Sequence, residues 1–101
     1  MILFGSSPAS PSLIREIIDT FDCDVTQTYT LTEAGGAWVT NMTPKDYRDA
    51  LESDSERLKS IGRCRVHFEA SIRSEDGAEL APNQSGELWV RGVPVMKEYL
   101  N

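Results

Sequence analysis

Residues 27–36, Gln-Thr-Tyr-Thr-Leu-Thr-Glu-Ala-Gly-Gly, gather hydroxyl, amide and carboxylate side chains directly before two glycines. Threonine hydroxyls can donate hydrogen bonds to phosphate oxygens, Glu33 can bind a hard cation such as Mg²⁺, and Tyr29 offers a flat face to a base. These residue types therefore suit a ligand that carries a phosphate, a metal ion and a base. The residues alone leave an alternative open, in which Thr-Leu-Thr-Glu is a helix cap or a solvated turn.

The strand that would carry these residues is predicted from the β-branched and aromatic side chains at 25–29. The apolar residues 2–4 predict an earlier, buried strand that ends at a glycine. Between the two strands, Ser10 and Pro11 favour the start of a helix, and apolar side chains recur at helical spacing as far as Phe21. Strand, helix and strand in this order predict a βαβ unit with parallel strands.

A second polar loop follows the first predicted strand. It consists of Gly5, Ser6, Ser7 and Pro8. Because parallel strands end on the same side of a sheet, this loop and residues 29–33 should lie next to each other at the carboxyl edge, where open α/β sheets bind ligands. Gly5 would allow close approach of a ligand to the backbone, and the two serines would add hydroxyls. The loop lacks the lysine and the spacing of a P-loop, so it is a weak phosphate motif.

The middle of the chain predicts a further strand and a second helix. Residues 37–40 have the composition of a strand, with Trp38 either in the core or in a pocket wall. Thr43 is placed as a helix N-cap followed by proline, and Asp46 can complete a capping box. The polar residues 54–59 predict a loop or a frayed helix.

The last third of the chain predicts antiparallel strands. Residues 66–73 alternate between apolar and polar side chains, and residues 86–92 form a second strand after a turn. Together they predict a small antiparallel sheet or barrel segment. His67 is placed in the first of these strands as a structural or surface residue, because no other histidine and no cysteine stands at ligand spacing. Residues 95–101 predict a last helical turn bearing Tyr99.

The composition is that of one small globular domain of 101 residues with a modest core. A formal net charge of −6, with only 10 scattered Lys and Arg residues, argues against a nucleic-acid surface. No apolar run has the length of a membrane span. Cys23 and Cys64 stand far apart without a CxxC motif, which supports neither a zinc site nor a disulfide framework and favours a reducing cytoplasm.

Five segments carry a resemblance to one family. Residues 27–33 are similar to the pattern Gln-x-Tyr-Gly-x-Thr-Glu, and residues 5–10 to a Gly-Gly-Ala-Pro-Leu loop. Residues 60–63 resemble Ser-x-Gly-Arg, residues 86–92 resemble Gly-Glu-Leu-x-Val-x-Gly, and residues 96–101 look like Gly-Tyr-x-Asn. In their order and spacing along the chain, these segments resemble the signatures of adenylate-forming ligases, the AMP-binding superfamily of acyl-CoA synthetases, luciferases and peptide-synthetase adenylation domains.

The resemblance implies a role for each matching position. Thr32 would contact the α-phosphate of ATP and Glu33 would help to bind Mg²⁺, which makes these two the catalytic positions. Tyr29 and the loop 5–8 would flank the adenine of ATP or AMP. The acyl pocket would be lined by Thr30, Gly35 and Trp38.

The resemblance also implies a two-step reaction. A carboxylic acid, fatty or aryl, reacts with ATP to give an acyl-adenylate and pyrophosphate, and the thiol of coenzyme A then displaces AMP. The family's Gly/Ser/Thr-rich phosphate loop and its catalytic lysine have no counterpart in these 101 residues. We therefore expect an internal segment of a longer ligase, inactive when alone.

The expected fold class is α/β plus β, with a βαβ unit from the edge of a parallel sheet followed by a small antiparallel β-barrel-like segment, as in luciferases and acyl-CoA synthetases. The end of a nucleotide-binding subdomain is placed at 1–42, an acidic helical linker at 43–60, and an incomplete barrel-like subdomain at 61–101. Exposed strand edges predict self-association of the chain.

Two alternatives remain beside the ligase hypothesis. One is a stand-alone acidic module that binds a nucleotide or a protein without catalysis. The other is a degenerate ligase relative, which is favoured by Thr30 standing where the family has glycine. A β-branched residue there would either narrow the acyl pocket or mark a site that no longer turns over.

Overall fold

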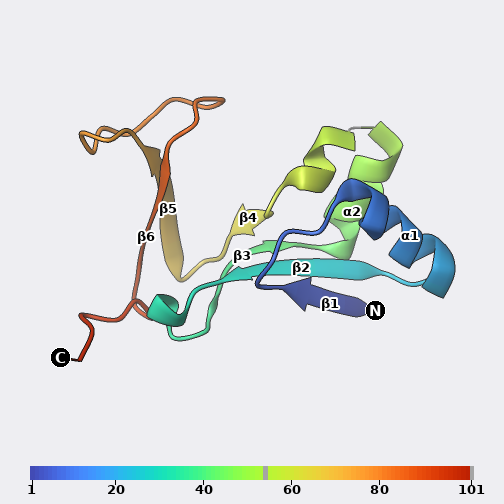
Figure 1. Ribbon diagram of the computed structural model, residues 1–101, viewed down its shortest axis with the longest axis horizontal. Coiled ribbons are helices and arrows are strands. Elements are labelled where there is room, and N and C mark those ends of the chain that lie inside the picture. The colour runs from blue at the N-terminus through green and yellow to red at the C-terminus, as the bar shows by residue number, and fades with distance from the viewer. Residues whose placement is uncertain (54, 101) are drawn as a thin grey trace.

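The computed structural model of the chain describes residues 1–53 and 55–100. With η denoting a 3₁₀ helix, its elements are β1 (Ile2–Gly5), α1 (Pro11–Phe21), β2 (Val25–Thr30), η1 (Thr32–Ala34), β3 (Trp38–Met42), α2 (Pro44–Ser53), η2 (Ser55–Lys59), β4 (Arg63–Cys64), β5 (Phe68–Arg73) and β6 (Glu87–Gly92). Strands β1 to β4 form one sheet, and β5 and β6 form a second sheet of two strands. Figure 1 shows the second sheet standing away from the first.

The first sheet is mixed. β1 pairs with β2 in parallel, which confirms the predicted βαβ unit, whereas β2–β3 and β3–β4 pair antiparallel. In the second sheet, β5 and β6 pair antiparallel over six residues each, as expected. No closed barrel forms within residues 1–53 and 55–100, so the barrel-like description and the three-part division of the chain stay predictions.

Both helices begin where their capping residues predict. The backbone amide of Leu13 donates to Ser10 Oγ at 3.2 Å, with Pro11 at the first helical position. At α2 the capping box is reciprocal, because Thr43 N donates to Asp46 Oδ2 at 2.9 Å and Asp46 N donates to Thr43 Oγ1 at 3.2 Å. Two of the amides that a helix start leaves unpaired are satisfied in this way.

The main core lies between the first sheet and its helices. Figure 1 shows α1 and α2 on the same side of that sheet. Burial of their apolar faces is the main favourable contribution to this packing. The fully buried members of the core are Ile14, Val25, Met42, Tyr47, Ala50 and Leu58.

Polar side chains are also buried along β2 and β3, and several of them hydrogen-bond to one another or to neighbouring elements. Tyr47 Oη donates to Gln27 Oε1 at 2.9 Å, which ties α2 to β2. Asn41 Nδ2 donates to Thr26 Oγ1 at 3.0 Å and to Gln27 O at 2.9 Å. In the described part of the chain no buried side-chain nitrogen or oxygen is left without a hydrogen bond. Gln27, the first residue of the polar motif, therefore serves the core and not the surface.

Two local predictions were wrong, at residues 66–67 and 95–100. Residues 66–67 form a turn, so His67 precedes β5 instead of lying in a strand. Of the loop and the frayed helix predicted for 54–59, the structure has a helix, the 3₁₀ helix η2 at 55–59, and Asp54 lies outside the described residues. Residues 63–64 add a short strand for which there was no prediction. Residues 95–100 are not helical, and Asn101 lies outside the described residues. None of the helices in 1–53 and 55–100 is long and apolar enough to span a membrane.

Candidate active site

Strands β1 and β2 bring two of the predicted polar segments to one edge of the first sheet. The parallel register pairs Gly5 with Thr28, and β2 continues to Thr30. The loop after β1 therefore leaves the sheet beside the last residues of β2, as predicted. The turn η1 lies further along, beyond the end of β2 (Figure 1).

Gly5 is required by the neighbouring strand. A Cβ atom at this position would lie 2.7 Å from the backbone oxygen of Thr28 and 2.9 Å from its Oγ1. This clash alone is enough to require glycine at position 5. The sequence analysis had explained Gly5 by the close approach of a ligand to the backbone. The loop residues Ser6, Ser7 and Pro8 are exposed, and Ser6 has a left-handed backbone with φ of 64°. That conformation is uncommon for a residue other than glycine and is often found at functional sites.

A bulge lies where β2 approaches the candidate site. Tyr29 pairs with Thr40 and Thr30 pairs with Trp38, so the intervening Val39 is an extra residue on β3. Bulges of this kind bend a strand and change the aim of nearby side chains, and they are frequent beside active sites. Val39 is fully buried, whereas Tyr29 and Thr30 are half-buried and Trp38 is 42% exposed. Trp38 is therefore not a core residue, which leaves the pocket-wall prediction for it.

The turn η1 holds Thr32 and Glu33 directly after β2. It is closed by backbone hydrogen bonds, from Ala34 N to Leu31 O at 3.1 Å and from Gly35 N to Thr32 O at 2.9 Å. The chain leaves it through Gly35, whose φ of 64° favours glycine. The segment is a turn, as the alternative hypothesis held, but Leu31 occupies the N-cap position and Thr32 is helical. Thr32 is exposed, so its hydroxyl remains available to a ligand.

Glu33 is held by the segment that follows β6. The hydroxyl of Tyr99 donates to Glu33 Oε1, and the backbone amide of Met96 donates to Glu33 O at 2.7 Å. The Tyr99 hydrogen bond, with a smaller contribution from the backbone amide of Glu33, keeps the pKa of this carboxyl below its ordinary value, against the effect of burial. The same bond raises the pKa of Tyr99. Analysis of the sequence missed this pair. It named Tyr99 only as part of a predicted last helical turn and of the segment similar to Gly-Tyr-x-Asn.

A second apolar cluster packs the turn η1 against the second sheet. Ala34, Val39 and Phe68 are buried together, and Leu31, Val90 and Val95 are among the side chains packed against them. A cavity of about 160 Å³ beside this cluster is lined by Leu31, Glu33, Ala34, Leu88, Val90 and Val95. It is smaller than the roughly 300–1,000 Å³ typical of small-molecule sites, so it cannot enclose a nucleotide. The cluster joins η1 to the second sheet.

The donor set fits a magnesium ion that arrives with a nucleotide. Among residues 1–53 and 55–100, no three His, Cys, Asp or Glu side chains come together as a metal site. Mg²⁺ is commonly bound through one or two carboxylates, with water and substrate phosphates completing its shell. The single carboxylate of Glu33 at the sheet edge fits that arrangement. The described residues do not form a site in which protein ligands alone surround the ion.

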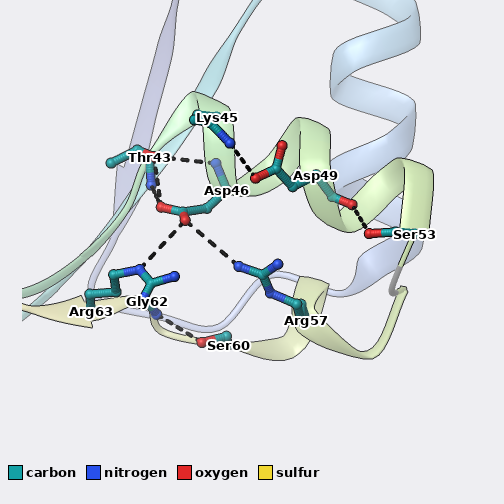
Figure 2. A network of polar contacts seen from close by, with 9 residues as sticks. All are labelled: Thr43, Lys45, Asp46, Asp49, Ser53, Arg57, Ser60, Gly62 and Arg63. Carbon is teal, nitrogen blue, oxygen red and sulfur yellow. Dashed lines mark hydrogen bonds and ion pairs between the residues drawn. The ribbon is translucent and has the colours of Figure 1, made fainter.

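Asp46 links α2 to the segment that resembles Ser-x-Gly-Arg. In addition to the capping box, its Oδ2 accepts from Thr43 Oγ1 at 2.6 Å, and its Oδ1 lies 3.8 Å from both Arg57 and Arg63 (Figure 2). The Thr43 hydrogen bonds, followed by the two guanidinium groups, lower the pKa of Asp46 against the effect of burial. These contacts position the chain between α2 and β4.

Gly62 completes this junction. Its φ is 89°, and a Cβ atom would lie 2.1 Å from Asn41 O. Its amide donates to Ser60 Oγ at 3.0 Å, as Figure 2 shows. Ser60 and Gly62 therefore shape the turn that brings β4 against β3, which is a structural role.

Comparison with known proteins identifies the family. The family model for the AMP-binding enzyme matches residues 1–100. The chain belongs to this family of AMP-binding enzymes, which confirms the resemblance seen in the motifs, and curated CoA ligases and solved acyl- and aryl-CoA synthetase structures match it.

Among its relatives, the 4-coumarate--CoA ligase-like 9 of Arabidopsis thaliana is 31% identical over 98 residues, which cover 95% of this chain and 16% of that protein. The mitochondrial medium-chain acyl-CoA ligase ACSF2 of Bos taurus is 35% identical over 99 residues, covering 96% and 15%. The chain thus spans about a sixth of these relatives. A solved structure, O-succinylbenzoate coenzyme A synthetase (MenE) from Bacillus subtilis in complex with ATP and magnesium ion, matches with a TM-score of 0.77 and 31% identity over 99% of this chain and 19% of its own.

Proposed function

We propose that this chain forms part of the adenylation site of a longer AMP-forming carboxylate–CoA ligase. The substrates would be ATP, coenzyme A and a fatty or aryl carboxylic acid. The acid would displace pyrophosphate from ATP to give an acyl-adenylate, and the thiol of coenzyme A would then displace AMP. Family membership and the ligase relatives support this reaction class.

The observation that carries the proposal is the parallel pairing of β1 with β2, which places the loop 5–8 and the turn η1 along the same carboxyl edge. Ligands of open α/β sheets bind at that edge. In the proposed site, the loop and Tyr29 flank the adenine, and the exposed hydroxyl of Thr32 donates to the α-phosphate. Glu33 offers a carboxylate oxygen to the metal ion.

Mg²⁺, when bound, would offset the negative charge that develops on the phosphates during the transfer. The residues of this chain supply position and neutral donors. Because Tyr99 holds the carboxylate of Glu33 and the Met96 amide holds its backbone oxygen, the carboxylate needs little rearrangement to meet the nucleotide.

The acyl end of the site would lie at the bulge. Thr30 and Trp38 pair there across β2 and β3, and Gly35 ends the turn between them. A methyl-bearing side chain at Thr30 would take space that glycine leaves open in the family pattern. We propose that this position limits the width of the acid that is accepted.

The experiment is acid-dependent exchange of pyrophosphate into ATP, run with the full-length protein and a panel of hydroxycinnamic and medium-chain fatty acids. We expect exchange with at least one acid class, and a loss of at least ten-fold in Glu33→Gln. The matched control is Glu16→Gln, the same substitution at an exposed position on α1, which should exchange like the parent.

Two results would contradict the proposal. Exchange by the 101-residue chain alone would show that a longer protein is not needed. ATP binding without exchange by the full-length protein, for any acid tested, would favour the degenerate relative that Thr30 suggests.

A further inference from the structure

A contact between distant parts of the chain converges on the candidate metal ligand. Tyr99 stands 66 positions after Glu33 and donates its hydroxyl to Glu33 Oε1. The same segment, residues 94–99, also approaches the turn through its backbone. Met96 N donates to Glu33 O at 2.7 Å, and Pro94 O would lie 3.4 Å from a Cβ at Gly35. Residues 94–99 therefore run alongside η1.

Packing alone does not explain the position of Tyr99. Its side chain is 67% exposed, so little apolar area is gained by placing it there. The apolar attachment of this segment is made instead by Val95, which packs against the cluster of Ala34, Val39 and Phe68. What the tyrosine adds at η1 is its hydrogen bond to the carboxylate.

That hydrogen bond restricts a flexible side chain. A glutamate has three rotatable bonds, and ordering it costs conformational entropy each time it binds a ligand. Tyr99 holds one oxygen, Oε1, so the other oxygen, Oε2, can be offered to a cation. Partners that hold a metal-binding carboxylate in this way strengthen metal binding by orienting the ligand in advance.

We propose that Tyr99 is a positioning residue for Glu33. The Tyr99 hydroxyl fixes the Glu33 carboxylate for the divalent cation that accompanies the nucleotide. This inference rests on the proposed function. It adds that the segment after β6, the last strand of the second sheet, determines the geometry of a site beside the first sheet.

The test compares four forms of the full-length protein: the parent, Tyr99→Phe, Glu33→Gln and the double variant. The direct readout is binding of Mn²⁺ in the presence of AMP, followed by the paramagnetic resonance signal of free Mn²⁺. The second readout is the Mg²⁺ concentration that gives half-maximal pyrophosphate exchange. Tyr47→Phe is the matched control, because it removes a tyrosine hydroxyl that bonds only within the core.

We expect Tyr99→Phe to weaken Mn²⁺ binding and to raise the Mg²⁺ requirement by about 3- to 10-fold. This is at or below the low end of the roughly 10- to 100-fold range seen for such partners, because the contact is exposed. The exchange rate at saturating Mg²⁺ should stay close to that of the parent. In the Glu33→Gln background the same change should have no further effect. Tyr47→Phe should leave both metal readouts unchanged.

The outcomes separate the two proposals. If Glu33→Gln weakens Mn²⁺ binding while Tyr99→Phe binds like the parent, the positioning role is wrong and the proposed site stands. If Glu33→Gln itself binds Mn²⁺ and exchanges like the parent, the proposed metal site fails, and the inference fails with it. Equal losses by Tyr99→Phe with and without Glu33 would also overturn the inference, because they would show an effect that does not pass through the carboxylate.

Discussion

Replacing Tyr47 with phenylalanine removes one hydroxyl from the core and leaves its acceptor unpaired. Tyr47 is 1% exposed and Gln27 is 7% exposed, so water cannot replace the lost donor without opening the core. The hydrogen bond is 2.9 Å long. A buried polar group left unsatisfied costs about 1–3 kcal/mol, and we expect a loss of unfolding free energy in that range.

The same substitution has a pH signature. Burial raises the pKa of Tyr47 from 10.0 to about 12. Because the folded chain keeps the hydroxyl protonated to higher pH than the unfolded chain does, this contribution to stability is complete below pH 10 and is lost as the pH rises toward 12. Two pKa units correspond to about 3 kcal/mol. The stability gap between the parent and Tyr47→Phe should therefore shrink above pH 10.

The assay is urea unfolding of both forms at pH 7, 9, 10 and 11, followed by the fluorescence of Trp38 and Trp89. The parent should lose stability between pH 10 and 11 more steeply than Tyr47→Phe. Parallel curves across this range, or a difference below about 0.5 kcal/mol at pH 7, would refute the claim that Gln27 and Tyr47 form a buried pair.

Four further outcomes follow from other parts of the structure. Gly62→Ala should lower the unfolding free energy by at least about 2 kcal/mol in urea titrations, since a positive φ and a backbone clash combine there; a smaller loss would mean that β4 is not held against Asn41. Asp46→Asn should lower the unfolding free energy at neutral pH. Because the folded-state pKa of Asp46 is lowered, the difference in unfolding free energy between the parent and the variant should disappear as the pH falls through that pKa. A difference that persists in acid would argue against the capping box and its ion pairs. Thr30→Gly in the full-length protein should admit wider acids in the exchange assay, and an unchanged acid range would remove Thr30 from the acyl pocket. The isolated chain should self-associate in sedimentation, because β1 and the second sheet leave strand edges unpaired in the described residues; a monomer at all concentrations would contradict this.

Local signals predicted the parts of the fold that are determined locally. Ser10 with Pro11, and Thr43 with Asp46, start helices because their side chains satisfy the first amides, which requires only neighbours in sequence. The order of strand, helix and strand then determined the parallel pairing of β1 with β2, and with it the shared edge of the candidate site.

The features that were missed depend on long-range contacts. The strand β4 has two residues and forms only because Thr40 and Asn41 are there to pair with it. Gln27 was grouped with the polar motif at 27–36, and only the packing of α2 shows that it faces Tyr47. The hydrogen bond between Tyr99 and Glu33 joins the segment after β6 to the turn η1, 66 residues earlier in the chain, and no periodicity along the chain encodes such a pair.

The most direct measurement is a crystal structure of the full-length protein with an acyl-adenylate analogue in which a sulfamate replaces the phosphate. We predict that the sulfamate lies within hydrogen-bond distance of Thr32, that the adenine lies between Tyr29 and the loop 5–8, and that the acyl group points toward Thr30. Analogue bound at another edge of the sheet, with η1 left empty, would contradict the central claim that this turn is the adenylation site.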